Sequence, residues 1–399
     1  MDSLIAPNNA WPVWAFIIGG AAVSVYLEQT YRWAANLSGP VVALLVGMGL
    51  SNFKLMPVES PYYDVVDGYL VRIAVPLLLL RANLVRIWRE TGKMLVPFHL
   101  ATIGSILGGI LAGFLFRGNK EIVHVPEVSG VMTASYVGGG VNFVAVAESY
   151  KLSSELTNPL LVADNFVMAG FFVLLLSIAA SKFFRRHYPH PHSLDGDKED
   201  VRALAARHWC RKEISLLDVA KGLAIAVAVA AVSVLVTDYL KARVESKIVA
   251  SIFANPFVLI TILTVALATL FHKQTGKIQG ADEVGMFLLY LFFTVIGLRA
   301  DFVEVVKNVP VLFALCLVIA VVNLAFTLGV GKLLRLNLEE LLLSSNATLG
   351  GPPSAMAMAI SRGWSNLVVP GLLAGLWGYV IGTFVGIVVT ESLRRMFGS

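Results

Sequence analysis

Two short segments contain the residue types that could bind a solute or an ion, and both lie within strongly apolar sequence. The first runs from Thr133 to Asn142 and the second from Asn346 to Ser354. Each contains a glycine pair, and glycine costs a helix about 1 kcal/mol relative to alanine. At membrane depth a broken helix is tolerated only where protein buries it or where it lines an aqueous cavity. Broken segments in corresponding halves of a chain are typical of the binding site of a secondary transporter.

The two segments match each other, which predicts an internal duplication. If Val137 is treated as an insertion, Gly138 and Gly139 fall on Gly350 and Gly351, with small, hydroxyl and apolar residues matching on either side. Three further matches occur at nearly constant spacing: Pro40 with Pro256, Leu80–Val85 with Leu298–Val303, and Pro159 with Pro370. One match alone would mean little, but together they favour a repeat. For the Arg-Ala-Asn/Asp part of the second match, packing at helix ends is the expected role.

The remaining sequence predicts a polytopic membrane protein. Hydrophobic residues make up 57% of the 399 residues and charged residues 14%. Apolar runs near the roughly 20 residues that cross a bilayer cover about 11–28, 37–55, 68–84, 94–116, 157–183, 217–240, 256–270, 285–298, 310–334 and 368–390. We therefore expect an all-α integral membrane protein with about ten transmembrane helices in two inverted repeats, each with a Gly-Gly broken helix or re-entrant hairpin. The expected division is a first repeat at 1–187, a polar cytoplasmic linker at 188–216, and a second repeat at 217–399.

The positive charge indicates membrane topology rather than nucleic-acid binding. The net charge is +5, but the basic residues are scattered at helix ends. If both Gly-Gly segments are hairpins, the loops holding the following residues share one side: Arg86, Arg89, Lys93, Lys182, Arg185, Arg186, Lys273, Lys277, Lys332 and Arg335. The positive-inside rule makes that side cytoplasmic, and the N-terminus shows no targeting peptide, so a bacterial inner membrane is expected. A topology in which both segments cross the membrane would split these charges, although Arg394 and Arg395 fit the hairpin version poorly.

The hairpin version predicts where ligands bind. The second arm of each hairpin would begin just after the glycines, and a helix N-terminus attracts a carboxylate or another anion. Unwound carbonyls around Gly138–Gly140 and Gly350–Pro352 would supply oxygen ligands for Na⁺. The predicted substrate-binding residues are Ser135, Gly138, Gly139, Gly140, Asn142, Gly350, Gly351, Pro352 and Ser354. The predicted Na⁺ or H⁺ site comprises Thr133, Asn142, Asp164, Asn165, Ser345, Asn346 and Thr348. The alternative is that small and hydroxyl residues only pack helices closely.

Asp164 is the acidic residue that lies deepest in an apolar run. A carboxylate within a membrane is costly and indicates a cation ligand or a proton carrier. The matching position in the second half is Gly375, so the carboxylate has no partner there. A structural carboxylate that bonds a hydroxyl of the hairpin is the alternative.

Motifs for other activities are absent from the sequence. We find no P-loop, no His-Glu-x-x-His and no Gly-x-Ser-x-Gly, so no catalytic residue and no organic cofactor are predicted. The linker and the residue just before it hold His187, His190, His192, His208 and Cys210, but their spacing matches no zinc pattern. We therefore expect these residues to lie in a solvated linker rather than in a metal site.

The Gly-Gly motifs resemble those of known carriers. The segments Ser135–Asn142 and Ala347–Ser354, each before the last span of a five-span unit, are similar to the hairpin tips of the glutamate:sodium and 2-hydroxycarboxylate:sodium symporters. More distantly they resemble the bile-acid:sodium symporters and the sodium/proton antiporters. Over nearly its full length the chain also resembles an uncharacterised "domain of unknown function" membrane family of the same superfamily. The antiporters' adjacent acidic pair and the basic substrate-clamping residue of the 2-hydroxycarboxylate carriers are both missing.

This resemblance implies an alternating-access carrier, often a homodimer. We expect sodium-coupled symport of a small, carboxylate-bearing organic solute across the lipid bilayer. One alternative is a proton-coupled exporter or antiporter that uses Asp164. Another is a membrane-embedded enzyme or sensor on the same scaffold, which the missing catalytic motifs disfavour.

Overall fold

The protein is helical throughout the part of the chain that the structure describes. A computed structural model describes residues 3–31, 34, 39–192, 213–243, 253–300 and 302–398, and these residues form helices and connecting turns without a strand. Among these described residues, seven helical stretches are long and apolar enough to cross a membrane: Ala10–Thr30, Leu84–Leu115, Ser154–Ala180, Leu216–Arg243, Ala281–Leu298, Val309–Leu333 and Ser365–Phe397. The prediction of an all-α membrane protein is confirmed.

The other predicted spans form shorter or composite helices. Helices α3 (Gly39–Asn52) and α15 (Pro256–Leu270) are apolar but short. Helices α4 (Pro61–Val65) and α5 (Val71–Leu79) join through a π-helical turn at Val66–Leu70. The first half continues with α1 (Ala10–Thr30), α6 (Leu84–Thr91), α7 (Leu95–Leu115), α8 (Val125–Gly138), α9 (Gly140–Ser149) and α10 (Ser154–Ala180). The second half contains α13 (Leu216–Arg243), α17 (Ala281–Leu298), α18 (Phe302–Leu333), α19 (Leu338–Ser361) and α20 (Val368–Phe397).

Helices α5 and α17 are joined at both ends by arginines of the repeated Arg-Ala-Asn/Asp motif. Arg81, just after α5, contacts Asp282 at the start of α17 at 3.5 Å. Arg299, just after α17, contacts Asp67 at 2.5 Å and Asp64 at 2.9 Å, both at the start of the α4–α5 unit. Each motif therefore ties the end of one helix to the beginning of the other, which is the helix-end role expected of it.

Glycines bring the central helices into backbone contact. A Cβ atom on Gly104 of α7 would lie 2.8 Å from the Cα of Asn323 in α18, and one on Gly108 would lie 2.8 Å from the Cα of Ile319. In α20, a Cβ on Gly375 would lie 2.6 Å from the nitrogen of Pro352 in α19, and one on Gly386 would lie 2.8 Å from the carbonyl oxygen of Gly130 in α8. Helix α20 therefore packs closely on both Gly-Gly segments, as small residues allow in membranes.

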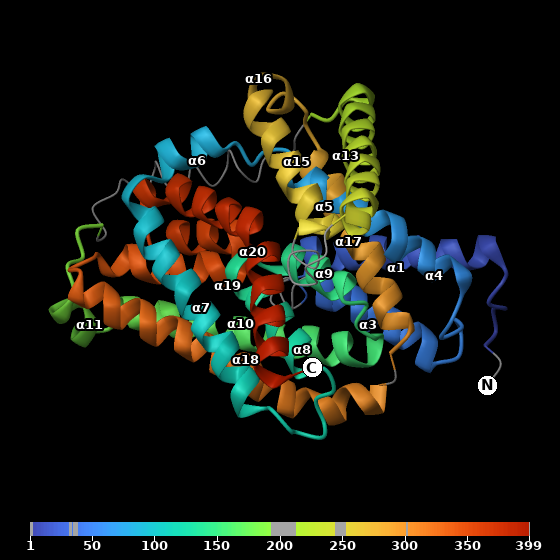
Figure 1. Cartoon of the computed structure of the whole chain (residues 1–399), viewed down its shortest axis with the longest axis horizontal. Coiled ribbons are helices and arrows are strands. Elements are labelled where there is room, and N and C mark those ends of the chain that lie inside the picture. Colours follow the sequence, from blue (N-terminus) through green and yellow to red (C-terminus); the bar gives the residue numbers. More distant parts are fainter. Residues whose placement is uncertain are drawn as a thin grey trace.

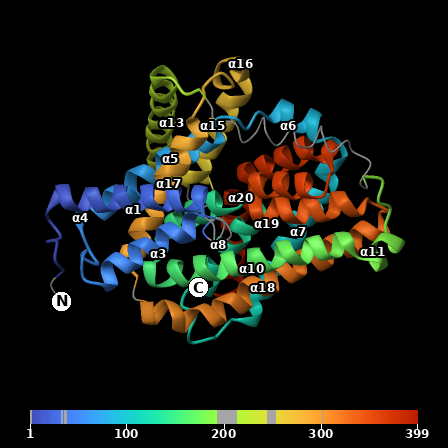
Figure 2. The same cartoon turned by 180° about the vertical axis from the view of Figure 1, so that it is seen from behind.

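The short, basic helices lie along one border of the molecule. Helix α6, α11 (Lys182–His187) and α16 (His272–Thr275) follow the upper and left-hand border in Figure 1, away from the N-terminus, and the reverse view in Figure 2 agrees. These helices carry many of the basic residues that defined the predicted cytoplasmic side. Their common border is consistent with that prediction, and the linker's cysteine, Cys210, lies outside the described residues.

Candidate functional site

Each Gly-Gly segment is broken at a single glycine. Gly139 has φ 73° and ψ −172°, and Gly351 has φ 69° and ψ −171°. This region of backbone conformation is essentially restricted to glycine. We expected a longer unwound stretch at Gly138–Gly140 and at Gly350–Pro352, but the helix resumes directly after each break. Unwound carbonyls are therefore fewer than the sequence suggested.

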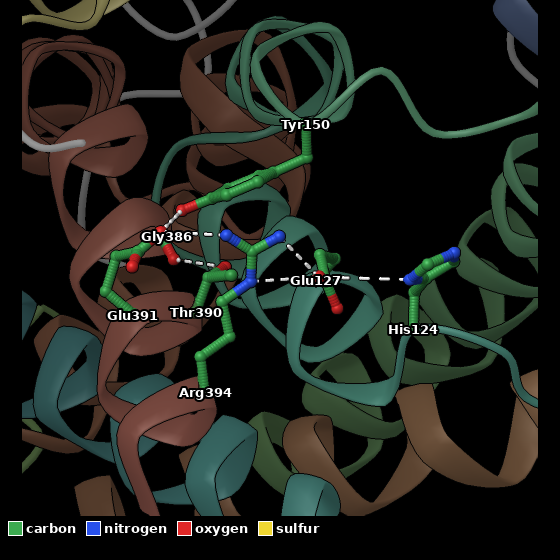
Figure 3. A network of polar contacts seen from close by, with 7 residues as sticks. All are labelled: His124, Glu127, Tyr150, Gly386, Thr390, Glu391 and Arg394. Carbon is green, nitrogen blue, oxygen red and sulfur yellow. Dashed lines mark hydrogen bonds and ion pairs between the residues drawn. The ribbon is translucent and has the colours of Figure 1, made fainter. Parts of the chain in front are cut away.

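The first break produces a hairpin, because both of its ends reach Arg394 at the end of α20 (Figure 3). Glu127, in the first turn of α8, accepts hydrogen bonds from Arg394 at 2.6 and 2.9 Å. Tyr150, directly after α9, has its ring 4.7 Å from the same guanidinium and donates to Glu391 at 2.8 Å. The chain therefore enters beside Arg394, turns at Gly139 and returns to its starting level.

These contacts also explain the poor fit of Arg394 to the predicted topology. Its guanidinium contacts Glu127 at 2.6 Å and Glu391 at 3.3 Å. An arginine that is neutralised by two carboxylates is a weak topology signal, so its position conflicts little with a hairpin.

The second break also reverses the chain. Asn346 donates to the carbonyl oxygen of Ser354 at 2.9 Å, and the Ser354 hydroxyl donates back to Asn346 Oδ1 at 2.9 Å. In a straight helix, residues eight positions apart are separated by about 12 Å. Glu339 at the start of α19 and Arg362 after its end line the same cavity. Both arms therefore open at the same level.

The two hairpins meet at their tips. A Cβ atom on Gly139 would lie 3.7 Å from the Cα of Gly351, and one on Gly351 would lie 3.2 Å from the ring of Tyr379 in α20. The second hairpin opens beside Trp364, just before α20 begins, and the first opens beside Arg394, where α20 ends. The hairpins thus approach each other from opposite ends of α20.

Asp164 forms a buried polar group with the first hairpin. Its Oδ2 accepts a 2.9 Å hydrogen bond from the hydroxyl of Ser135. Its side chain is buried, and its Oδ1 has no hydrogen-bond partner among the described residues. The hydroxyl of Tyr136 and the thiol of Cys316 lie close to it. The structure therefore brings together the predicted residues Ser135 and Asp164, surrounded by neutral donors.

A second polar group connects the two hairpins through residues that sequence reasoning missed. Asn323 of α18 donates to Thr348 at 3.2 Å and to Ser105 at 2.9 Å. Ser105 of α7 donates in turn to the carbonyl oxygen of Tyr136 at 2.5 Å. An amide in the middle of the apolar run at 310–334 was the available signal, because polar groups at membrane depth are rarely without a role. Thr348 also donates to the carbonyl oxygen of Ser345, whose own hydroxyl has no partner among the described residues.

Other predicted residues bond within their own neighbourhood. Asn142 donates to the carbonyl oxygens of Gly138 and Gly378 at 3.0 and 3.3 Å and accepts from Thr383 at 2.7 Å, which ties the first hairpin to α20. The Thr133 hydroxyl donates to Ser129 within α8 at 2.7 Å, and Asn165 donates to Leu161 within α10 at 2.9 Å. These bonds are structural, and a direct role of these three residues in ion binding stays a prediction.

At each hairpin tip, an exposed residue lies just after the glycine at which the helix breaks. Gly140 is exposed, whereas Gly138 and Pro352 are buried and Gly350 is partly buried. Pro353, next to Pro352, is also exposed, although we did not predict it as a site residue. The start of each second arm is therefore the part of the hairpin tip that a solute could reach.

The ion pair between Arg394 and Glu127 should stabilise the fold. Arg394→Gln would leave the buried Glu127 carboxylate without its cationic partner, and we expect a loss of about 1–3 kcal/mol, because Arg394 is partly exposed. Thermal or denaturant unfolding of the purified protein measures this loss. Arg395→Gln is the matched control, since Arg395 is adjacent and exposed. Equal stability of the two variants would show that the Arg394–Glu127 ion pair contributes nothing to the free energy of unfolding.

The chain matches one protein family and a bacterial membrane protein over nearly its whole length. Residues 15–396 match the family described as "Protein of unknown function (DUF819)". The chain is 42% identical over 390 residues to the uncharacterized membrane protein YjcL of Bacillus subtilis (strain 168), and the match covers 97% of each chain. The similarity therefore includes both hairpins and α20. The resemblance to an uncharacterised membrane family is confirmed, whereas the relation to the sodium symporters stays a prediction.

Proposed function

Since the chain belongs to the DUF819 family of membrane proteins, we propose that it is a secondary active transporter of a small organic solute. The observation that carries the proposal is the meeting of two glycine-hinged hairpins, Gly139 against Gly351, from opposite ends of α20. Broken helices that meet inside a membrane protein are the usual site for substrate and coupling ion. An inner membrane of a bacterium is the proposed location.

The proposed solute carries a carboxylate or a similar anion. The second arm of the first hairpin begins at Gly140, which is exposed, so the positive end of this helix is accessible at the tip. In the second hairpin Pro352 and Pro353 have no N–H group to donate, so the first hairpin would supply most backbone donors. Tyr379, beside both glycines, would contact the solute from α20.

Sodium is the proposed coupling ion. Buried oxygen atoms without a partner among the described residues occur at two of the predicted ligands, Asp164 Oδ1 and Ser345 Oγ. Buried polar atoms rarely lack a partner, and hard cations prefer oxygen ligands. These two oxygens support a cation in this region, although no hydrogen bond between described residues joins them into one group.

Proton coupling is the second candidate, and Asp164 favours it. A buried carboxyl group with one free oxygen could carry a proton as well as bind a cation. In that case Asp164 would be protonated on one side of the membrane and deprotonated on the other.

Reconstitution in vesicles tests the proposal. A thermal-shift screen of amino acids, dicarboxylates, short peptides and sterol acids, with and without Na⁺, would first identify ligands, because a ligand stabilises the state it binds. Uptake of a hit should then follow an imposed Na⁺ gradient. Uptake driven fully by a pH gradient in sodium-free medium would favour the second candidate, and failure of every gradient to drive solute movement would contradict both.

A further inference from the structure

The base of the second hairpin contains a buried carboxylate that lacks the partner present in the first. Glu127 precedes Gly139 by the same number of residues as Glu339 precedes Gly351, so both stand in the first turn of a hairpin. Glu127 is held by the Arg394 guanidinium at 2.6 Å. Glu339 is 4% exposed, and its Oε2 accepts no hydrogen bond from any described residue.

Glu339 lies in a small cavity that is also lined by two arginines, a histidine and three apolar residues. Ala179, Arg185, His190, Leu338, Glu339, Arg362 and Trp364 line this cavity. Its volume is about 20 Å³, which is enough for a group the size of a water molecule or an ammonium. Neither Arg185 nor Arg362 forms an ion pair with another described residue, and the neighbouring carboxylate, Glu340, is paired with His192 at 3.4 Å.

A wider basic groove continues outward from this cavity. Arg185 and His190 line both spaces, and the groove also includes Arg186, His187, Tyr188, Pro189, Pro191 and Asn337. Its volume is about 740 Å³, and it is open to the surface. The buried Glu339 carboxylate therefore lies at the inner end of an exposed basic groove, which is the charge pattern that a zwitterion with a cationic tip would match.

We propose that this cavity and groove bind a phosphoethanolamine group. The ammonium would donate to Glu339 Oε2, in the place that the Arg394 guanidinium takes at Glu127. The phosphate would lie against Arg185 and Arg362, because guanidinium groups bind phosphate with charge-assisted hydrogen bonds. The proposal concerns binding and does not depend on transport.

The position of the groove favours a lipid as the source of this group. Helix α11 follows the membrane-spanning α10 directly and combines Lys182, Arg185 and Arg186 with Phe183, which is 64% exposed. Basic and apolar residues mixed on a short helix are typical of a membrane interface, and basic pockets there bind lipid headgroups. A phosphatidylethanolamine headgroup would reach the groove from the leaflet, with its ammonium in the cavity.

Lipid retention by the full-length protein tests this site. Native mass spectrometry would compare phosphatidylethanolamine with phosphatidylcholine, which has the same charges but no N–H donor, and with phosphatidylglycerol, which has no ammonium. We expect phosphatidylethanolamine to be held about tenfold better than phosphatidylcholine, the size of one charge-assisted hydrogen bond. Because the wild-type protein alone gives this comparison, a variant that fails to fold does not obscure it.

Variants then locate the binding. Glu339→Gln should remove the preference for phosphatidylethanolamine, whereas the control Glu340→Gln should keep it. Arg185→Gln should weaken retention of both zwitterionic lipids about tenfold, whereas Lys182→Gln at an exposed position should not. Displacement of the lipid by soluble phosphoethanolamine, but not by inorganic phosphate, would support the same chemistry with a soluble source. Equal retention of all three lipids, or a preference that survives Glu339→Gln, would overturn the proposal.

Discussion

Replacing Gly139 or Gly351 with leucine is expected to reduce transport by about 100-fold or more while membrane insertion continues. Both glycines have positive φ in a region that costs other residues about 1–3 kcal/mol, so the hairpin turn itself would be strained. The added side chain would also meet the opposite tip and the Tyr379 ring, since even a Cβ on Gly351 would lie 3.2 Å from that ring. Displacing a binding group by about 1 Å can lower a rate by about 100-fold. Initial uptake rates in vesicles, normalised to folded protein, measure the effect.

Gly170→Leu is the matched control for these variants. Gly170 lies within α10, has helical backbone and is exposed, and a Cβ there would have no atom within 4 Å. Transport should therefore change little, and leucine should even favour this helix. If both leucine variants transported normally, the Gly-Gly segments would be packing devices only.

Replacing Asp164 with asparagine should separate the two coupling hypotheses. With sodium coupling, loss of the carboxylate should weaken the apparent Na⁺ affinity by about tenfold or more, because an amide oxygen carries no net charge, while uptake still follows the Na⁺ gradient. With proton coupling, the variant should lose its response to a pH gradient and keep passive exchange. Uptake measured against Na⁺ concentration at two pH values distinguishes these results.

Two further variants make the Asp164 test specific. Ser135→Ala removes the 2.9 Å hydrogen bond to Asp164 but keeps the carboxylate, so we expect a smaller change in the same direction. Glu155→Gln changes an exposed carboxylate at the start of the same helix and should have no effect. Unaltered ion dependence in Asp164→Asn would show that Asp164 is a structural residue that bonds the hairpin.

The sequence alone determined the membrane-protein class and the order of the helices. Long apolar runs cannot be hidden in a small soluble fold, so the runs that began near Trp11, Leu217 and Pro256 became α1, α13 and α15. The glycine pairs also identified the breaks at Gly139 and Gly351. Glycine has no Cβ, so it adopts the positive φ of such a break with little steric cost. Periodicity and composition are local properties, and they could be read without knowing any contact.

Only the tertiary structure decided which polar groups meet. The position of Asn142 beside the glycines predicted a ligand role, which stays a prediction, but gave no sign that its amide joins the first hairpin to Gly378 and Thr383 of α20. Asn323 was not predicted at all, although it links α7, α18 and α19. Glu127 and Glu339 each stand twelve residues before a hinge glycine, yet an arginine packs beside Glu127 and a small cavity lies beside Glu339. Hydrogen bonds between distant segments depend on how the helices pack. The close approach of α7, α18 and α20 through glycine contacts is a property of the assembled bundle rather than of any one segment.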